Sequence, residues 1–220
     1  MQQWIGFDGD QLPPMIVAGE GRKVQDADGR WYYDGTSSIW VNVHGHRHPV
    51  LDHAVRAQLD RIAHSTLLGQ ANAPSSALAH LLSELTGGRL PRVFFGDNGS
   101  GAVEAAIKIA VQYHANLARA RGETSRRWKV LGFTNNYHGD TLGAVGVGYE
   151  AFFHRPFLEM LGGHPKAPFP YLYRPPIGPA EQSPDELADR CISEAGKVLD
   201  EHAEERSEER RVGKECFLLC

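Results

Sequence analysis

The chain has 220 residues, of which 41% are hydrophobic and 23% charged, with a formal net charge of −4 and a pI near 6.2. This length holds one large domain or two small ones, and the composition is that of a globular protein. The balance of charge gives no reason to expect nucleic acid or an anionic membrane as a partner. No apolar run approaches the roughly 20 residues that span a bilayer, and the first ten residues have no leader pattern, so we expect a cytoplasmic protein.

The first quarter of the chain predicts a hairpin followed by a loop rich in turn-forming residues and histidine. The hairpin covers residues 22–34, with its turn at Asp28-Gly29 between two short β-forming runs. A helix is then expected from Pro49, and a second from Pro74 that ends at Gly87-Gly88. Both helices carry an apolar stripe at helical spacing, made by Leu51, Val55, Leu59 and Ile62 in the first and by Leu78, Leu81, Leu82 and Leu85 in the second.

The middle of the chain predicts an alternation of strands and helices. Residues 92–96 and 129–133 are short apolar runs typical of buried strands, and a long helix that ends at Gly122 lies between them. Residues 165–184 contain seven prolines, which indicates an irregular crossing, and a last helix is expected over 184–205. Strands that alternate with helices predict an α/β domain with a largely parallel sheet.

The turn Asn98-Gly99-Ser100-Gly101, between a predicted strand and a predicted helix, is the strongest candidate for a ligand site. A helix N-terminus offers unpaired N–H groups and the positive end of the helix dipole, which together bind phosphate. Glycine lets the backbone approach an anion, and the Ser100 hydroxyl adds a donor. The alternative is a tight turn without a ligand. A Rossmann dinucleotide site is disfavoured, because Glu104 stands where the third glycine of that motif would be.

A second candidate, Tyr137-His138-Gly139-Asp140, follows the next predicted strand. Ligands of α/β sheets lie at the carboxyl ends of strands, so this segment and the Gly99 turn are expected at one rim. The Tyr137 ring could lie beside a planar cofactor, and the alternative is a loop tyrosine with a satisfied hydroxyl. The run from His44 to His48 carries three histidines, but its glycine and the proline after it favour a loop over a metal site.

Four stretches in this order resemble the class III (subgroup II) aminotransferases. They read DADGRWYYDGTSSIW, HGHRHP, RVFFGDNGSGAVEAAIKIAVQY and NNYHGDTLGAVGV, and the resemblance extends from about Ile16 to Tyr149, then weakly to about Glu205. The combination of DNGS…AVE, YHGDT and SS-x-W is typical of the members that serve biotin synthesis. The resemblance implies an amino transfer to 8-amino-7-oxononanoate, with S-adenosylmethionine as donor and pyridoxal 5′-phosphate (PLP) as cofactor.

The resemblance also implies a fold and a set of site residues. The fold is PLP fold type I, an α/β class with an αβα three-layer large domain, a small domain and a homodimer. Residues 1–50 would belong to the small domain and residues 51–206 to a partial large domain. By the same resemblance Gly99 and Ser100 bind the cofactor phosphate, and Tyr137 lies near the pyridine ring with His138 beside it. Tyr137, Ile39 and Trp40 would contact the substrate.

The chain departs from the family's pattern at two places that concern the substrate. Ile39 stands where the biotin-pathway members usually carry a first aromatic residue, with Trp40 retained, and Phe7 stands where a tyrosine is usual. These changes leave open another class III transaminase that acts on an ω-amino acid or a diamine. A non-catalytic truncated protein is a further alternative.

Family members are about twice as long, and the resemblance places their Schiff-base lysine beyond residue 220. None of the lysines present lies in a matching motif: Lys23, Lys108, Lys129, Lys166, Lys197 and Lys214. The last residues, 207–220, turn abruptly to Glu and Arg and then to an apolar end with two cysteines. They resemble translated adapter sequence, so we expect a non-native tail, and the alternative is a solvated end of a charged helix.

Overall fold

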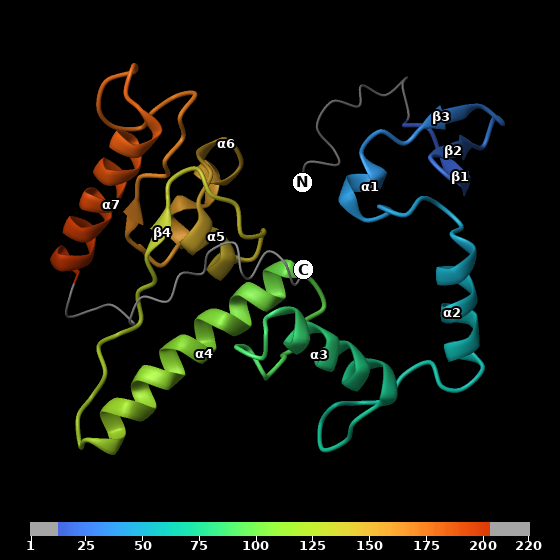
Figure 1. Cartoon of the computed structure of the whole chain (residues 1–220), viewed down its shortest axis with the longest axis horizontal. Helices are drawn as coiled ribbons and strands as arrows, with labels where there is room; N and C mark the ends of the chain where they lie inside the picture. Colours follow the sequence, from blue (N-terminus) through green and yellow to red (C-terminus); the bar gives the residue numbers. More distant parts are fainter. Residues whose placement is uncertain (1–12, 203–220) are drawn as a thin grey trace. The chain divides into compact units, whose positions relative to one another are not determined.

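The computed structural model describes residues 13–202 of the chain (Figure 1). The chain divides into two compact units, one ending at Ala77 and the other beginning at Leu78, and each is described on its own. Phe7, which stands where the family usually has a tyrosine, and the predicted tail over 207–220 lie outside the described residues. No helix in the described part of the chain is long and apolar enough to cross a membrane.

The first unit is built on a three-stranded antiparallel sheet of β1 (Ile16–Glu20), β2 (Lys23–Asp26) and β3 (Trp31–Tyr33), in that order. The pairing of β2 with β3 confirms the hairpin expected from the Asp28-Gly29 turn. Asp26, which is 2% exposed, holds the turn together because its carboxylate accepts hydrogen bonds from Asp28 N, Arg30 N, Arg30 Nε and the Tyr32 hydroxyl. These bonds, the one from Tyr32 first, lower the pKa of Asp26 to about 2.

The segment after the hairpin forms one left-handed turn, α1 (Ser37–Trp40), in which all four residues have φ between 50° and 68°. Such values are unfavourable for a β-branched residue such as Ile39, so other contacts must impose them. Asp34 supplies these contacts, because its carboxylate accepts hydrogen bonds from Ser38 N at 2.9 Å and from Ser38 Oγ at 2.8 Å.

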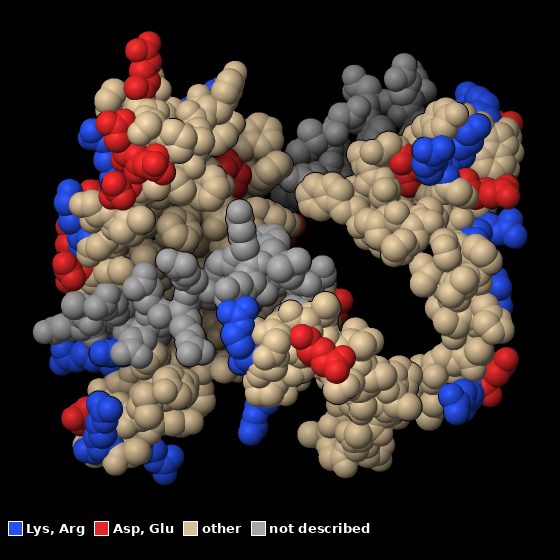
Figure 2. Space-filling model, in the orientation of Figure 1, with Lys and Arg blue, Asp and Glu red and all other residues tan. Residues whose placement is uncertain are grey.

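Helices α2 (Pro49–Leu59) and α3 (Ala73–Leu85) confirm the two helices expected from periodicity and from proline at the start. The negative charge of Asp52, in the first turn of α2, interacts favourably with the positive end of the helix dipole. Neither helix has a buried residue, and the predicted apolar stripes are exposed except at the half-buried Leu82. Residues other than Lys, Arg, Asp and Glu make up most of α2 in the space-filling view (Figure 2).

The second unit centres on α4 (Gly99–Ala120), which confirms the long helix predicted between the two apolar runs. Asn98 caps it by accepting a hydrogen bond from Gly101 N at 2.8 Å. The helix ends before Gly122, whose φ of 73° suits glycine at a helix C-terminus.

A small core lies beside α4, around a parallel pair of short strands, β4 (Gly132–Phe133) and β5 (Lys166–Ala167). Three short helices follow β4 in the chain: α5 (Leu142–Gly148), α6 (Ala151–His154) and the 3-10 helix η2 (Arg155–Met160). Buried side chains of α5 and β5 form this core: Ala144, Val145, Val147 and Ala167.

The last described helix, α7 (Pro184–Glu201), confirms the start predicted at Pro184. Ser183 and Glu186 form a reciprocal capping box, in which each side chain bonds the backbone N–H of the other residue. The helix buries Leu187 and Cys191, and α7 contacts β5.

Three predictions about this unit were wrong or incomplete. Residues 92–96 form no strand, since no described residue pairs with them, and the strand expected over 129–133 is reduced to Gly132–Phe133. The irregular crossing over 165–184 contains β5, the parallel partner of β4. The sequence predicted no element after Thr141, where small residues form α5. A strand depends on hydrogen bonds from a neighbouring strand, so an apolar run alone does not establish one.

Candidate functional site

The two segments that the sequence singled out, about 40 residues apart, meet at the N-terminus of α4. Asp140 N donates a hydrogen bond to Ser100 Oγ at 3.2 Å. Gly139 lies so close to Ser100 that a Cβ there would overlap the serine hydroxyl and would come within 2.7 Å of Ser100 Cβ. The φ of 115° at Gly139 is a second reason for glycine at this position. The two segments therefore lie side by side, as expected, although residues 92–96 before the α4 turn form no strand.

The first residues of α4 present an anion-binding geometry. Asn98 takes up the N–H of Gly101, and the N–H groups of Gly99 and Ser100 have no partner among the described residues. The Ser100 hydroxyl accepts from Asp140 N, so its own proton remains available as a donor. Since α4 is 22 residues long, its dipole adds a partial positive charge at this end. Two N–H groups and one hydroxyl suit a phosphate.

Glu104 joins the same two segments one turn further along α4. Its Oε1 accepts a hydrogen bond from Gly143 N at 2.9 Å, in the first turn of α5. A Cβ at Gly143 would lie 2.5 Å from the Glu104 carboxylate, so only glycine allows this approach. Glu104, which stands where a dinucleotide motif would have its third glycine, thus connects the N-terminal parts of α4 and α5.

Tyr137 lies half-exposed beside the α4 N-terminus and donates a hydrogen bond to Asp140 Oδ2 at 2.9 Å. Desolvation is the main reason why the pKa of the Tyr137 hydroxyl is raised, and the hydrogen bond to Asp140 raises it further. The hydroxyl therefore stays protonated at neutral pH. The ring stacks on that of His154, with centroids 6.2 Å apart and planes 14° apart. One face of Tyr137 is thus supported from within the unit.

His138 points into the core of the second unit. It is buried, its Nε2 lies 3.1 Å from Asn136 Nδ2, and a Cβ at Gly148 would come within 2.8 Å of its Cδ2. Burial, and then the charge of Lys166, lower the pKa of His138. Lys166 donates to Gly146 O at 2.6 Å, and burial lowers its own pKa to about 8. His138 is therefore a neutral, packed side chain next to the site at neutral pH.

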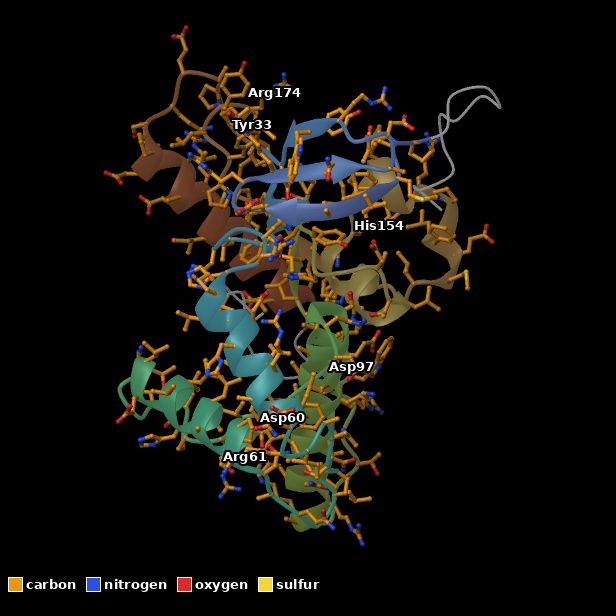
Figure 3. All side chains as sticks on the ribbon, turned by 90° about the vertical axis from the view of Figure 1, so that its right-hand side faces the viewer. Tyr33, Asp60, Arg61, Asp97, His154 and Arg174 are labelled. Carbon is orange, nitrogen blue, oxygen red and sulfur yellow. The ribbon has the colours of Figure 1, made fainter. Side chains whose placement is uncertain are left out.

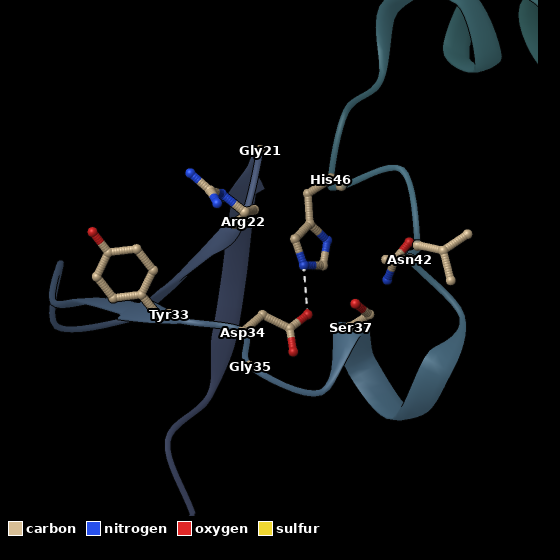
Figure 4. A pocket seen from close by; sticks show the side chains of 10 residues that line it. Gly21, Arg22, Tyr33, Asp34, Gly35, Ser37, Asn42 and His46 are labelled. Atoms are coloured by element: carbon tan, nitrogen blue, oxygen red, sulfur yellow. Dashed lines mark hydrogen bonds and ion pairs between the residues drawn. The ribbon is translucent and has the colours of Figure 1, made fainter.

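Ile39 and Trp40, the predicted substrate residues, belong to the first unit and are 73% and 81% exposed. Beside their turn lies a pocket of about 560 Å³, lined by Asp34, Ser37, Asn42 and His46 among others (Figure 4). His46 Nε2 lies 2.8 Å from Asp34 Oδ2. Hydrogen bonds from Ser38, and then from His46, lower the pKa of Asp34 to about 2.

The three histidines of the run from His44 to His48 contact different partners. His46 bonds Asp34, whereas the rings of His44 and His48 meet edge to face at 6.0 Å. No group of metal-binding side chains occurs among the residues that the structure describes.

Sequence reasoning missed three residues beside the candidate sites: Asp34 at the pocket next to α1, His154 beneath Tyr137 and Lys166 near His138. His154 and Lys166 lie in stretches without a motif, and only their burial beside the site draws attention to them. For Asp34, the following Gly-Thr-Ser-Ser run was a usable signal, because an aspartate before such residues commonly accepts their backbone N–H groups.

Comparison with known proteins identifies the class to which this fold and site belong. The family model for class III aminotransferases matches residues 6–205, and the chain therefore belongs to that family, whose members depend on PLP. The predicted resemblance and cofactor are confirmed.

Individual members of the family show which aminotransferases the chain resembles. The chain is 44% identical over 205 residues to adenosylmethionine-8-amino-7-oxononanoate aminotransferase of Nitratidesulfovibrio vulgaris, covering 93% of this chain and 36% of the relative. The crystal structure of the Methanocaldococcus jannaschii enzyme of that name matches with a TM-score of 0.73 and 35% identity, over 93% of this chain and 44% of the other. A PLP-bound amine transaminase from an uncultivated Pseudomonas species matches with a TM-score of 0.79 and 29% identity, over 93% and 46%.

These matches confirm the predicted fold class, PLP fold type I, over a partial segment. The chain spans less than half the length of each of these three proteins. The donors at the α4 N-terminus fit the phosphate of PLP in number and charge, since two N–H groups and a hydroxyl converge beside the half-exposed Tyr137 ring.

Proposed function

We propose that this chain provides the phosphate-binding part of a PLP-dependent aminotransferase that converts 8-amino-7-oxononanoate to 7,8-diaminononanoate with S-adenosylmethionine as amino donor. The hydrogen bond from Asp140 N to Ser100 Oγ carries the proposal, because it joins the phosphate-binding turn to the loop that bears Tyr137. The names of the relatives support the substrate pair. The product belongs to biotin synthesis.

The proposed roles follow from the position of each side chain. Gly99 and Ser100 hold the cofactor phosphate through backbone N–H groups and the serine hydroxyl. Tyr137 keeps its proton and covers one edge of the cofactor ring, with its hydroxyl available to the substrate. His138 supports this loop from the core as a neutral residue. PLP, when bound, supplies the electron sink for the transfer of the amino group.

The phosphate site is tested by binding of pyridoxamine 5′-phosphate, which needs no lysine. In the protein as its gene encodes it, we expect Ser100→Ala to weaken binding about fivefold to tenfold, the effect of one hydrogen bond to a charged group. Ser193→Ala, an exposed serine of α7, is the matched control and should bind as the parent does. Equal affinity of the parent and both variants, measured by calorimetry, would contradict a phosphate site at the N-terminus of α4.

A second candidate function is a class III transaminase that acts on an ω-amino acid or a diamine. The amine transaminase match and the aliphatic Ile39 favour it. Two assays of the gene product separate the candidates: labelled adenosylmethionine with 8-amino-7-oxononanoate, and a labelled ω-amino acid or diamine with pyruvate. Consumption of adenosylmethionine alone supports the first proposal, and consumption of the ω-amino acid or diamine alone supports the second.

We further propose that none of the lysines within residues 1–220 forms the Schiff base. Two of those described are already engaged, since Lys166 donates to Gly146 O and Lys197 pairs with Glu194. The 220-residue chain by itself is then inactive. Incubation with PLP, reduction with borohydride and peptide mapping test this, and stoichiometric labelling of one of these lysines contradicts it.

The domain assignment and the dimer are proposals of the same kind. Residues 1–50 are assigned to the small domain and 51–206 to part of the large domain of a homodimer. The apolar residues exposed on α2 and α3 support burial against further protein, and unburied faces of this kind favour association. Light scattering of the gene product should give a dimer, and a monodisperse monomer would contradict this.

A further inference from the structure

His154, at the end of α6, is a buried histidine to which the proposed chemistry assigns no role (Figure 3). It is 3% exposed, and its Nδ1 accepts a hydrogen bond from Glu150 N at 2.9 Å. An imidazole nitrogen that accepts carries no proton, so the neutral ring must carry its proton on Nε2. The backbone of α6 thus determines which nitrogen of His154 is the donor.

The Nε2 donor of His154 has no hydrogen-bond partner among the described residues, although it is buried. Asp140 Oδ1 lies 3.5 Å from it, which is longer than a hydrogen bond. A buried donor without a partner destabilises the folded state, so native proteins rarely keep one without a reason. This donor points toward the loop that carries Tyr137 and Asp140.

Asp140 is the junction between this histidine and the candidate site. Its backbone N–H bonds Ser100, and its Oδ2 accepts the proton of Tyr137. Its side chain is 77% exposed, so few contacts limit its rotation. The Tyr137 ring stacks on His154, and the three side chains are therefore one connected group.

We propose that His154 is a positioning residue, whose Nε2–H closes onto Asp140 Oδ1 when the site is occupied and so fixes the Tyr137 hydroxyl toward the substrate. The inference rests on the proposed function, in which Tyr137 faces the substrate. A carboxylate held through both oxygens has one orientation, and a hydrogen bond to a charged group is stronger than one between neutral groups. His154 touches neither substrate nor cofactor and acts through Asp140.

Three substitutions separate this role from simple packing. His154→Gln places an amide N–H near the position of Nε2 and keeps the donor toward Asp140. His154→Asn keeps a polar group near Glu150 N but cannot reach Asp140, and His154→Phe keeps only the ring beneath Tyr137. The matched control is His80→Gln, at an exposed histidine of α3.

The first readout is the ionisation of Tyr137 without any substrate, followed by ¹³C NMR of labelled tyrosine and assigned with Tyr137→Phe. With pyridoxamine 5′-phosphate bound, we expect the Tyr137 pKa to fall toward its ordinary value in His154→Phe and His154→Asn. It should stay raised in His154→Gln and His80→Gln. An unchanged Tyr137 pKa in His154→Phe and His154→Asn overturns the proposal, because a packing residue affects only stability.

The second readout needs no variant. A long-range ¹H–¹⁵N spectrum of the protein should show His154 protonated at Nε2, with a downfield shift of that proton when pyridoxamine 5′-phosphate binds. A proton on Nδ1, or an Nε2 proton that does not respond to binding, contradicts the proposal even if the variants fail to fold.

The third readout is activity. Loss of one hydrogen bond to a charged group predicts an increase of about tenfold in KM for the amino acceptor in His154→Phe, with kcat little changed and with recovery in His154→Gln. A fall in kcat with KM unchanged contradicts it. If the NMR results hold but no amino transfer is found with either donor, the proposed function fails and the coupling of His154 to Asp140 remains.

Discussion

The two units of the chain are ordered by different interactions. In the first unit the hydrogen bonds of Asp26 and Asp34 are mainly local: Asp26 holds its own turn over four to six residues, and Asp34 holds the next turn and reaches 12 residues to His46. In the second unit polar side chains join segments 39 and 40 residues apart, and apolar side chains of α5, β5 and α7 are buried. Short-range bonds thus establish a hairpin without a core, whereas a site that combines distant segments needs burial as well.

The largest expected effect lies in the second unit. Leu187→Ala should lower the free energy of unfolding by about 2–5 kcal/mol, because Leu187 is fully buried and the truncation leaves a cavity. Ile192→Ala, on the exposed side of the same helix, should cost much less. Urea unfolding of the two variants measures the difference, and equal losses would mean that α7 does not anchor this core.

Acid should weaken the turn that Asp26 holds in the first unit. The pKa of Asp26 in the folded chain is about 2, below its ordinary value of 3.8. Its contribution to stability is therefore complete above pH 3.8 and is lost as the pH falls through 2. Cross-strand NMR contacts between β2 and β3 should weaken in that window, whereas Asp26→Asn should weaken them already at pH 7. A hairpin in Asp26→Asn that matches the parent at both pH values would contradict this.

The capping box of α7 provides a smaller effect. Ser183→Ala should cost about 1 kcal/mol, since it removes the acceptor of Glu186 N. Ser193→Ala, within the same helix, tests the effect of alanine without a cap. If the two variants have the same melting temperature in a thermal scan, the capping box does not stabilise the helix.

The smallest effect is expected on α2. Leu59→Ala should change the free energy of unfolding by less than about 0.5 kcal/mol, because Leu59 is exposed in this chain. Unfolding in urea checks this in the 220-residue chain and in the protein as its gene encodes it. A loss of 2 kcal/mol or more, as is typical of a buried leucine, would show that further protein covers α2.

Much of the secondary structure could be predicted from short stretches. Proline and serine at helix starts, glycine at helix ends and a 3.6-residue apolar period located α2, α3, α4 and α7. The Asp28-Gly29 turn located the hairpin. The same reasoning failed at residues 92–96, which have the apolar character of a strand but no neighbouring strand in the described part of the chain. It also missed α5, because a run of small residues has no helical period.

The candidate site divides in the same way. Glycine and serine before a long helix predicted the phosphate-binding turn, and the family pattern predicted Tyr137 and His138. Neither indicated that Gly139 must touch Ser100, that Glu104 bonds Gly143, or that His154 lies beneath Tyr137. The sequence by itself determined the local elements, because caps, turns and periodicity act over four or five residues. The tertiary structure alone decided which loops meet, because contacts between residues about 40 positions apart depend on how the whole unit buries its apolar side chains.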